Sequence, residues 1–163
     1  MRPPALALVL LAALPACARC GAETPAAAPV ETAEAARVVT EEALAGAISA
    51  ARTRAEAGHR RVLLAFVGSG DADTRLVLRL LGEPAASASL ARGYELVWVN
   101  LGPSLEGQPR LRHAHDVDAV VTLVVLDPAS GRRAARRVFA PVSGHGTVTS
   151  ATLAAWLDDP RGR

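Results

Sequence analysis

Lysine is absent from the chain, and all 18 basic residues are arginine. Without an amine side chain there is no Walker-type phosphate loop, no Schiff-base lysine and no lysine general base. The formal net charge is +2 and becomes about +1 if Arg2 leaves with an N-terminal leader. This charge is too small to indicate nucleic acid as a partner, so we expect none.

Cysteine is almost absent: Cys17 and Cys20 are the only two, and they form a Cys-x-x-Cys near the N-terminus. A redox motif of this kind works when its first thiol lies at a helix N-terminus, which lowers the pKa of the thiol. No strand pattern precedes this pair, and a tract rich in Pro, Ala and Thr follows it. We therefore interpret it as a processing site with an incidental second cysteine. The alternative is a thiol–disulfide oxidoreductase that uses these two cysteines or a partner's thiols.

Long apolar runs are also missing. The run Ala5–Leu14 is too short for the roughly 20-residue helix that spans a bilayer, but it suits a signal-peptide core. It ends in Leu14-Pro-Ala-Cys17, which resembles a bacterial lipobox. We expect residues 1–17 to be a signal peptide with Cys17 lipidated, so that a periplasm-facing lipoprotein touches the membrane through its anchor only. Cleavage after Ala18, which gives a soluble periplasmic or secreted protein, is the alternative.

The rest of the chain is organised as a tether at 18–30, one domain at 31–159 and a tail at 160–163. A helical pattern covers 32–58, with a second start at Thr40. Apolar periodicity and the positions of Gly and Pro predict strands at 62–67, 94–101, 120–126 and 134–141, and helices at 74–81, 84–92, 109–115 and 150–159.

This order of elements resembles the thioredoxin-like superfamily over residues 43–157. In that family a strand like Val62–Val67 ends in a Trp-Cys-x-x-Cys turn, and the first cysteine caps the next helix. Val117–Pro128 is similar to the family's segment in which a cis-proline precedes a Thr-leading strand and an Asp-Pro hairpin. The resemblance implies an α/β fold with a mixed central four-stranded sheet and helices on both faces.

The family's spacing places Asp71 and Thr74 at the positions of its two redox cysteines, and Val121 at the position of its cis-proline. Attack on a disulfide requires a thiolate, and residues 21–163 contain no cysteine. We therefore expect no catalytic residue here, but a redox-inactive binding or assembly module of the bacterial cell envelope. We also expect the peptide bond before Val121 to be trans, because a cis bond before a residue other than proline is costly.

The resemblance further implies a contact surface for a protein or peptide partner, since the family's substrate groove lies between the turn and the loop before the third strand. We expect Asp71 and Asp73 to cap the helix after the turn. With Asp118 they predict an acidic edge suited to a basic or amphipathic segment. An enzyme using Asp71 as a general acid or base is the competing class, and it needs a buried carboxyl group. The possible partner surface comprises Ser69, Gly70, Asp71, Asp73, Asp118 and Val120.

No cofactor or metal is expected. Gly68-Ser-Gly70 follows a strand as in a dinucleotide fingerprint, but Asp73 stands where the third glycine belongs. His113 and His115 precede Asp116, and His145 lies in a later glycine-containing loop. Two histidines two residues apart do not share a helical face, so we interpret them as surface residues rather than metal ligands.

Overall fold

A computed structural model describes residues 39–104, 106–140 and 147–161. The predicted signal peptide, the tether, the first residues of the predicted domain and His145 lie outside the described residues. Cys17 and Cys20 do so too, so their processing stays a prediction. No helix among the described residues is long and apolar enough to cross a membrane.

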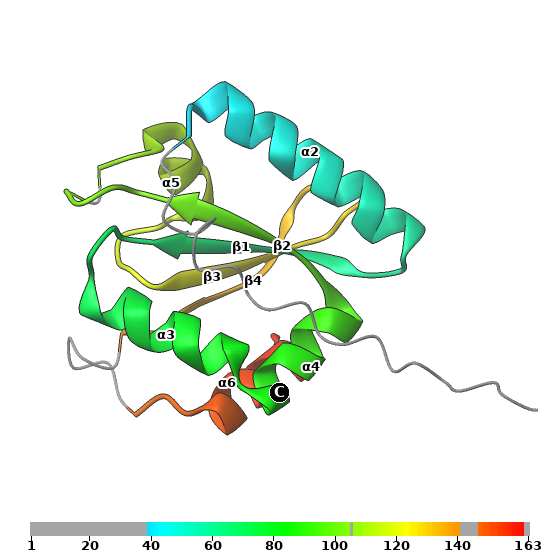
Figure 1. Ribbon diagram of the computed structural model, residues 1–163. Coiled ribbons are helices and arrows are strands. Elements are labelled where there is room, and N and C mark those ends of the chain that lie inside the picture. The colour runs from blue at the N-terminus through cyan, green and yellow to red at the C-terminus, as the bar shows by residue number, and fades with distance from the viewer. Residues whose placement is uncertain (1–38, 105, 141–146, 162–163) are drawn as a thin grey trace, which may run out of the picture.

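The core of the fold is a four-stranded mixed sheet with the strand order β2-β1-β3-β4 (Figure 1). β1 pairs in parallel with β2 and antiparallel with β3, and β3 pairs antiparallel with β4. The predicted α/β class and mixed sheet are therefore confirmed. The strands are β1 (Arg61–Val67), β2 (Tyr94–Asn100), β3 (Thr122–Leu126) and β4 (Arg133–Val138).

Helices cover both faces of the sheet, as predicted, with α2 and α5 on one face and α3, α4 and α6 on the other (Figure 1). Side chains of β1 alternate between the two cores: Leu63 packs towards α3, α4 and α6, whereas Leu64 packs towards α2. A strand buried on both faces is apolar throughout, which explains the unbroken apolar run. The helices are α2 (Glu41–Ala57), α3 (Ala72–Gly82), α4 (Pro84–Gly93), α5 (Pro109–His115) and α6 (Ser150–Asp158).

Helix boundaries follow the end signals in the sequence. Thr40 caps α2, since its side chain accepts a hydrogen bond from the Ala43 N–H at 3.3 Å. The helix start predicted at Thr40 is therefore confirmed, and α5 has the predicted bounds. β3 begins at Thr122, two residues later than predicted, so Val120 and Val121 belong to the loop before it.

Candidate functional site

The turn after β1 and the loop before β3 lie at the same end of the sheet. β1 and β3 run antiparallel, and Phe66 near the end of β1 pairs with Thr122 at the start of β3. The C-terminal end of β1 and the N-terminal end of β3 therefore lie at the same edge of the sheet. This register brings together the two segments that the sequence predicted to form one surface.

Asp71 caps helix α3, as predicted. Its Oδ2 accepts a hydrogen bond from the Thr74 N–H at 2.7 Å, and its backbone is extended as an N-cap requires. The Arg75 side chain donates to the Gly70 carbonyl oxygen at 2.6 Å across the same turn. The Asp71 side chain is half-exposed rather than enclosed. Its observed role is therefore to hold the start of the helix.

Thr74, which the sequence comparison with the family aligned with its second redox cysteine, is buried near the start of α3. Its Oγ1 accepts a hydrogen bond from the Gly68 N–H at 3.0 Å, and only 6% of the residue is exposed. A buried backbone N–H needs such an acceptor. Neither this hydroxyl nor the Asp71 carboxylate can exchange with a disulfide. Both side chains thus use an oxygen atom to accept a backbone hydrogen bond within the turn.

Asp73 was predicted to contribute to an exposed surface, and the structure contradicts this. Only 1% of Asp73 is exposed, and the residue has an interaction partner. It lies in the first turn of α3, where the helix dipole favours a negative charge. The face of the helix that carries Asp73 is turned into the protein, so its carboxylate cannot meet a partner directly.

Asn100, at the end of β2, connects the two parallel strands at this end of the sheet. Its Oδ1 accepts hydrogen bonds from the Ser69 hydroxyl at 3.0 Å and from the Gly102 N–H at 2.8 Å. The Ser69 N–H in turn donates to the Gly102 carbonyl oxygen at 3.3 Å. Sequence reasoning gave Asn100 no such role. The signal available was a polar residue that ends an otherwise apolar strand.

The peptide bond between Val120 and Val121 is cis, so the expected trans bond was wrong. That expectation considered only the preference of an isolated peptide bond. In the fold, Val121 is fully buried, and its N–H and carbonyl pair with the carbonyl and N–H of Phe139 at 3.3 and 2.7 Å. The cis bond thus occurs beside a tertiary pairing that the expectation did not consider. Val120 is also largely buried, at 8% exposed, so its side chain offers little contact surface.

Arginines of β4 accompany the acidic residues of this loop. Asp118 pairs with Arg136, and the Asp116 Oδ2 lies 2.7 Å from the Arg133 Nη1. The hydrogen bond and the positive charge of Arg133 lower the pKa of Asp116 from its usual value. Asp73 is buried as well, and Asp116 and Asp118 are each paired with an arginine of β4, so the edge does not carry the predicted excess of negative charge.

The histidines of α5 face different surroundings. His113 is exposed, whereas His115 is half-buried with its ring centroid 6.3 Å from that of Phe66. The buried Nδ1 of His115 has no hydrogen-bond partner among the described residues. Burial, followed by the charge of Arg133, lowers the pKa of His115. Within residues 39–104, 106–140 and 147–161, no three potential ligands are grouped to hold a metal ion.

No protein-family model matches the sequence, and no curated protein matches it. Solved structures do match.

A disulphide isomerase from Xylella fastidiosa Temecula1 is 15% identical, with 76% of this chain and 97% of that chain covered and a TM-score of 0.62. A thioredoxin from Thermus thermophilus is 18% identical, with 68% and 81% covered and a TM-score of 0.54. The oxidised C-terminal domain of DsbD from Neisseria meningitidis is 14% identical, with 77% and 100% covered and a TM-score of 0.53. The element order, the mixed sheet and these neighbours show that the chain has the thioredoxin fold.

Proposed function

We propose that this chain is a redox-inactive thioredoxin-fold module that binds or assembles a protein or peptide partner in the bacterial cell envelope. One observation carries the proposal. By the spacing of the thioredoxin-like superfamily, Asp71 and Thr74 stand at the positions of its two redox cysteines, and both are engaged in hydrogen bonds that build the turn. Neither side chain can supply a thiolate.

The partner surface in this proposal is narrower than the six residues taken from the sequence. Ser69 and Asp71 are partly exposed, Gly70 is exposed, and Asp118 is exposed on the facing loop. Asp73 and Val120 are buried, so they lie beneath this surface rather than on it. Because Phe139 occupies both backbone groups of Val121, an extended partner segment cannot pair with that residue. Mixed charge at this edge favours an amphipathic segment over a strongly basic one.

A thiol–disulfide oxidoreductase is the second candidate, favoured by the names of two structural neighbours, a disulphide isomerase and a DsbD domain. In this chain such an activity has to come from Cys17 and Cys20 or from a partner's thiols, because no other cysteine exists. An enzyme based on Asp71 has less support. A general acid at that position needs an enclosed carboxyl group, and Asp71 is a half-exposed helix cap.

The envelope location rests on the N-terminal sequence alone. The apolar run and the lipobox-like end support export and lipidation at Cys17, with a soluble periplasmic or secreted form as the alternative. Mass spectrometry of the mature N-terminus distinguishes the two. An acylated Cys17 supports the anchor, whereas an unmodified N-terminus at Arg19 supports the soluble form.

Site-specific photocrosslinking tests the partner surface in intact cells. A benzophenone side chain is placed at Ser69 or at Asp118, and the matched control carries it at Asp159, an exposed residue at the end of α6. The proposal expects a discrete crosslinked species from the first two positions and none from the control. Mass spectrometry of the crosslinked band then identifies the partner.

Two results would contradict the proposed partner surface. One is crosslinking of the same species with equal yield from Asp159, which indicates random collision. The other is the absence of any species from Ser69 and Asp118 while the protein is folded and abundant. A charge-reversing Asp118→Arg variant should weaken the Ser69 crosslink, because it also breaks the pair with Arg136.

A further inference from the structure

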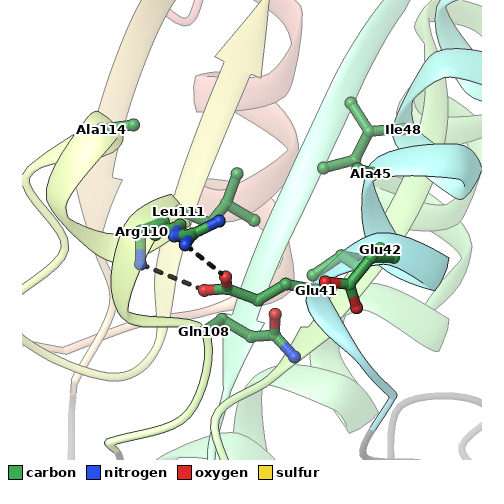
Figure 2. A pocket seen from close by; sticks show the side chains of 9 residues that line it. Glu41, Glu42, Ala45, Ile48, Gln108, Arg110, Leu111 and Ala114 are labelled. Atoms are coloured by element: carbon green, nitrogen blue, oxygen red, sulfur yellow. Dashed lines mark hydrogen bonds and ion pairs between the residues drawn. The ribbon is translucent and has the colours of Figure 1, made fainter.

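A groove of about 350 Å³ lies between α2 and α5, on the face of the sheet opposite α3 (Figures 1 and 2). Leu44, Ala45 and Ile48 of α2 form one wall, and Leu111 and Ala114 of α5 form the other. Small-molecule sites are usually apolar concavities of roughly 300–1,000 Å³ with a few polar groups. The groove has this size and lining, and it shares no residue with the proposed partner surface.

One buried side-chain oxygen in the groove has no hydrogen-bond partner among the described residues. It is the Oε1 of Gln108, a residue that is only 6% exposed. Leaving a buried acceptor unpaired is unfavourable, so native proteins rarely do it without a reason. A donor supplied by a ligand would satisfy it.

The orientation of the Gln108 amide is fixed by the hydrogen bond of its nitrogen. Its Nε2 donates to the Val39 carbonyl oxygen at 2.7 Å. Flipping the amide would set two acceptors against each other, so the oxygen is the unpaired atom. The backbone is fixed too. The Gly107 N–H donates to the Leu101 carbonyl oxygen at 2.9 Å, and a Cβ at Gly107 would come within 2.7 Å of that same oxygen.

The mouth of the groove is spanned by a loose ion pair. Glu41 at the start of α2 accepts from the Arg110 N–H at 3.2 Å, and its Oε2 lies 3.6 Å from the Arg110 Nε. Figure 2 shows the Gln108 amide below the Glu41 side chain, with its oxygen on that side. The Arg110 side chain is 90% exposed, and exposed pairs contribute little to stability. A ligand can therefore displace Glu41 at small cost and reach the oxygen.

We propose that the groove between α2 and α5 is a binding site for an uncharged, mainly apolar small molecule that carries one N–H or O–H donor. The apolar body lies against Leu44, Ile48 and Leu111, and the donor bonds to Gln108 Oε1. A charged ligand is disfavoured, because the acceptor is neutral and the mouth already holds both signs of charge. The site is independent of any partner at the turn after β1.

Indole and indene form a matched probe pair, since they share one shape and only indole has a donor. Each is titrated into the ¹⁵N-labelled full chain, and amide chemical shifts are followed. We expect saturable shifts confined to residues 41–48 and 107–115, with indole binding about three- to tenfold more tightly than indene. In Gln108→Met the preference for indole should vanish. Ala114→Phe, at an exposed helix position, should fill the groove and abolish binding of both probes.

Ala57→Phe is the control, because Ala57 is exposed on α2 and does not line the groove. It should bind both probes as the parent does. Equal affinity of the parent for indole and indene would overturn the role of Gln108. Unchanged binding by Ala114→Phe, or shifts spread over the whole chain, would overturn the site itself. These titrations need no partner at the turn after β1, so their results do not depend on whether the proposed function is correct.

Discussion

The Thr74 hydroxyl oxygen accepts a hydrogen bond from the Gly68 N–H at 3.0 Å, across the turn between β1 and α3. The Gly68 backbone is buried, so this hydroxyl satisfies a donor that water cannot reach. A thiol at this position would be a poorer acceptor. Thr74, which the family's spacing aligns with a redox cysteine, therefore contributes a hydrogen bond to the fold.

Replacing Thr74 with Val should destabilise the domain by about 1–3 kcal/mol, because the change keeps the side-chain shape and leaves the Gly68 N–H unpaired. Urea denaturation measures the loss. Thr53→Val is the matched control, since Thr53 is exposed on α2 and its hydroxyl only donates to the Ser49 carbonyl oxygen. A Thr74→Val protein as stable as the control would show that the hydroxyl has no structural role.

Substitutions at Asp71 should separate capping from charge. Asp71→Ala removes the acceptor for the Thr74 N–H and should cost about 0.5–2 kcal/mol of stability. Asp71→Asn keeps a capping oxygen and should stay close to the parent. Thermal or urea unfolding of both variants checks this. If Asn is as harmful as Ala, the negative charge matters more than the cap.

Stability should fall as the pH drops below about 6.5, partly because of His115. Burial lowers the folded-state pKa of His115 from 6.5, so the unfolded chain takes up the proton first. Protonation then favours unfolding, until the pH passes below the folded-state pKa. His115→Gln should flatten this part of the pH profile in urea denaturation series. An unaltered pH profile in His115→Gln would contradict the assignment.

The sequence predicted the scaffold well because its signals are local and strong. An apolar run with Gly turns specifies β1, and Pro109 marks the start of α5. Asp71 followed by a helical pattern is an N-cap signature, and the structure has that cap. Features that depend only on neighbouring residues could therefore be predicted.

Features set by tertiary contacts could not be predicted. Asp73 is buried because α3 turns that face inward, although an acidic residue next to a turn usually indicates exposure. The cis bond before Val121 accompanies pairing with Phe139, eighteen positions later, which no local rule contains. Gln108, between Gly107 and Pro109, was not singled out from the sequence, yet it is buried in the groove between α2 and α5.

The central claim is that the thioredoxin fold persists here without thiol–disulfide activity. Insulin reduction in the presence of dithiothreitol tests it directly, with the full chain compared with its Cys17→Ala/Cys20→Ala variant and with a catalytically active thioredoxin. We predict that the full chain and the variant both give only the background rate of dithiothreitol alone, because neither has a thiolate at the start of α3. Activity in the full chain that disappears in the variant would contradict the account and establish the N-terminal cysteines as a redox pair.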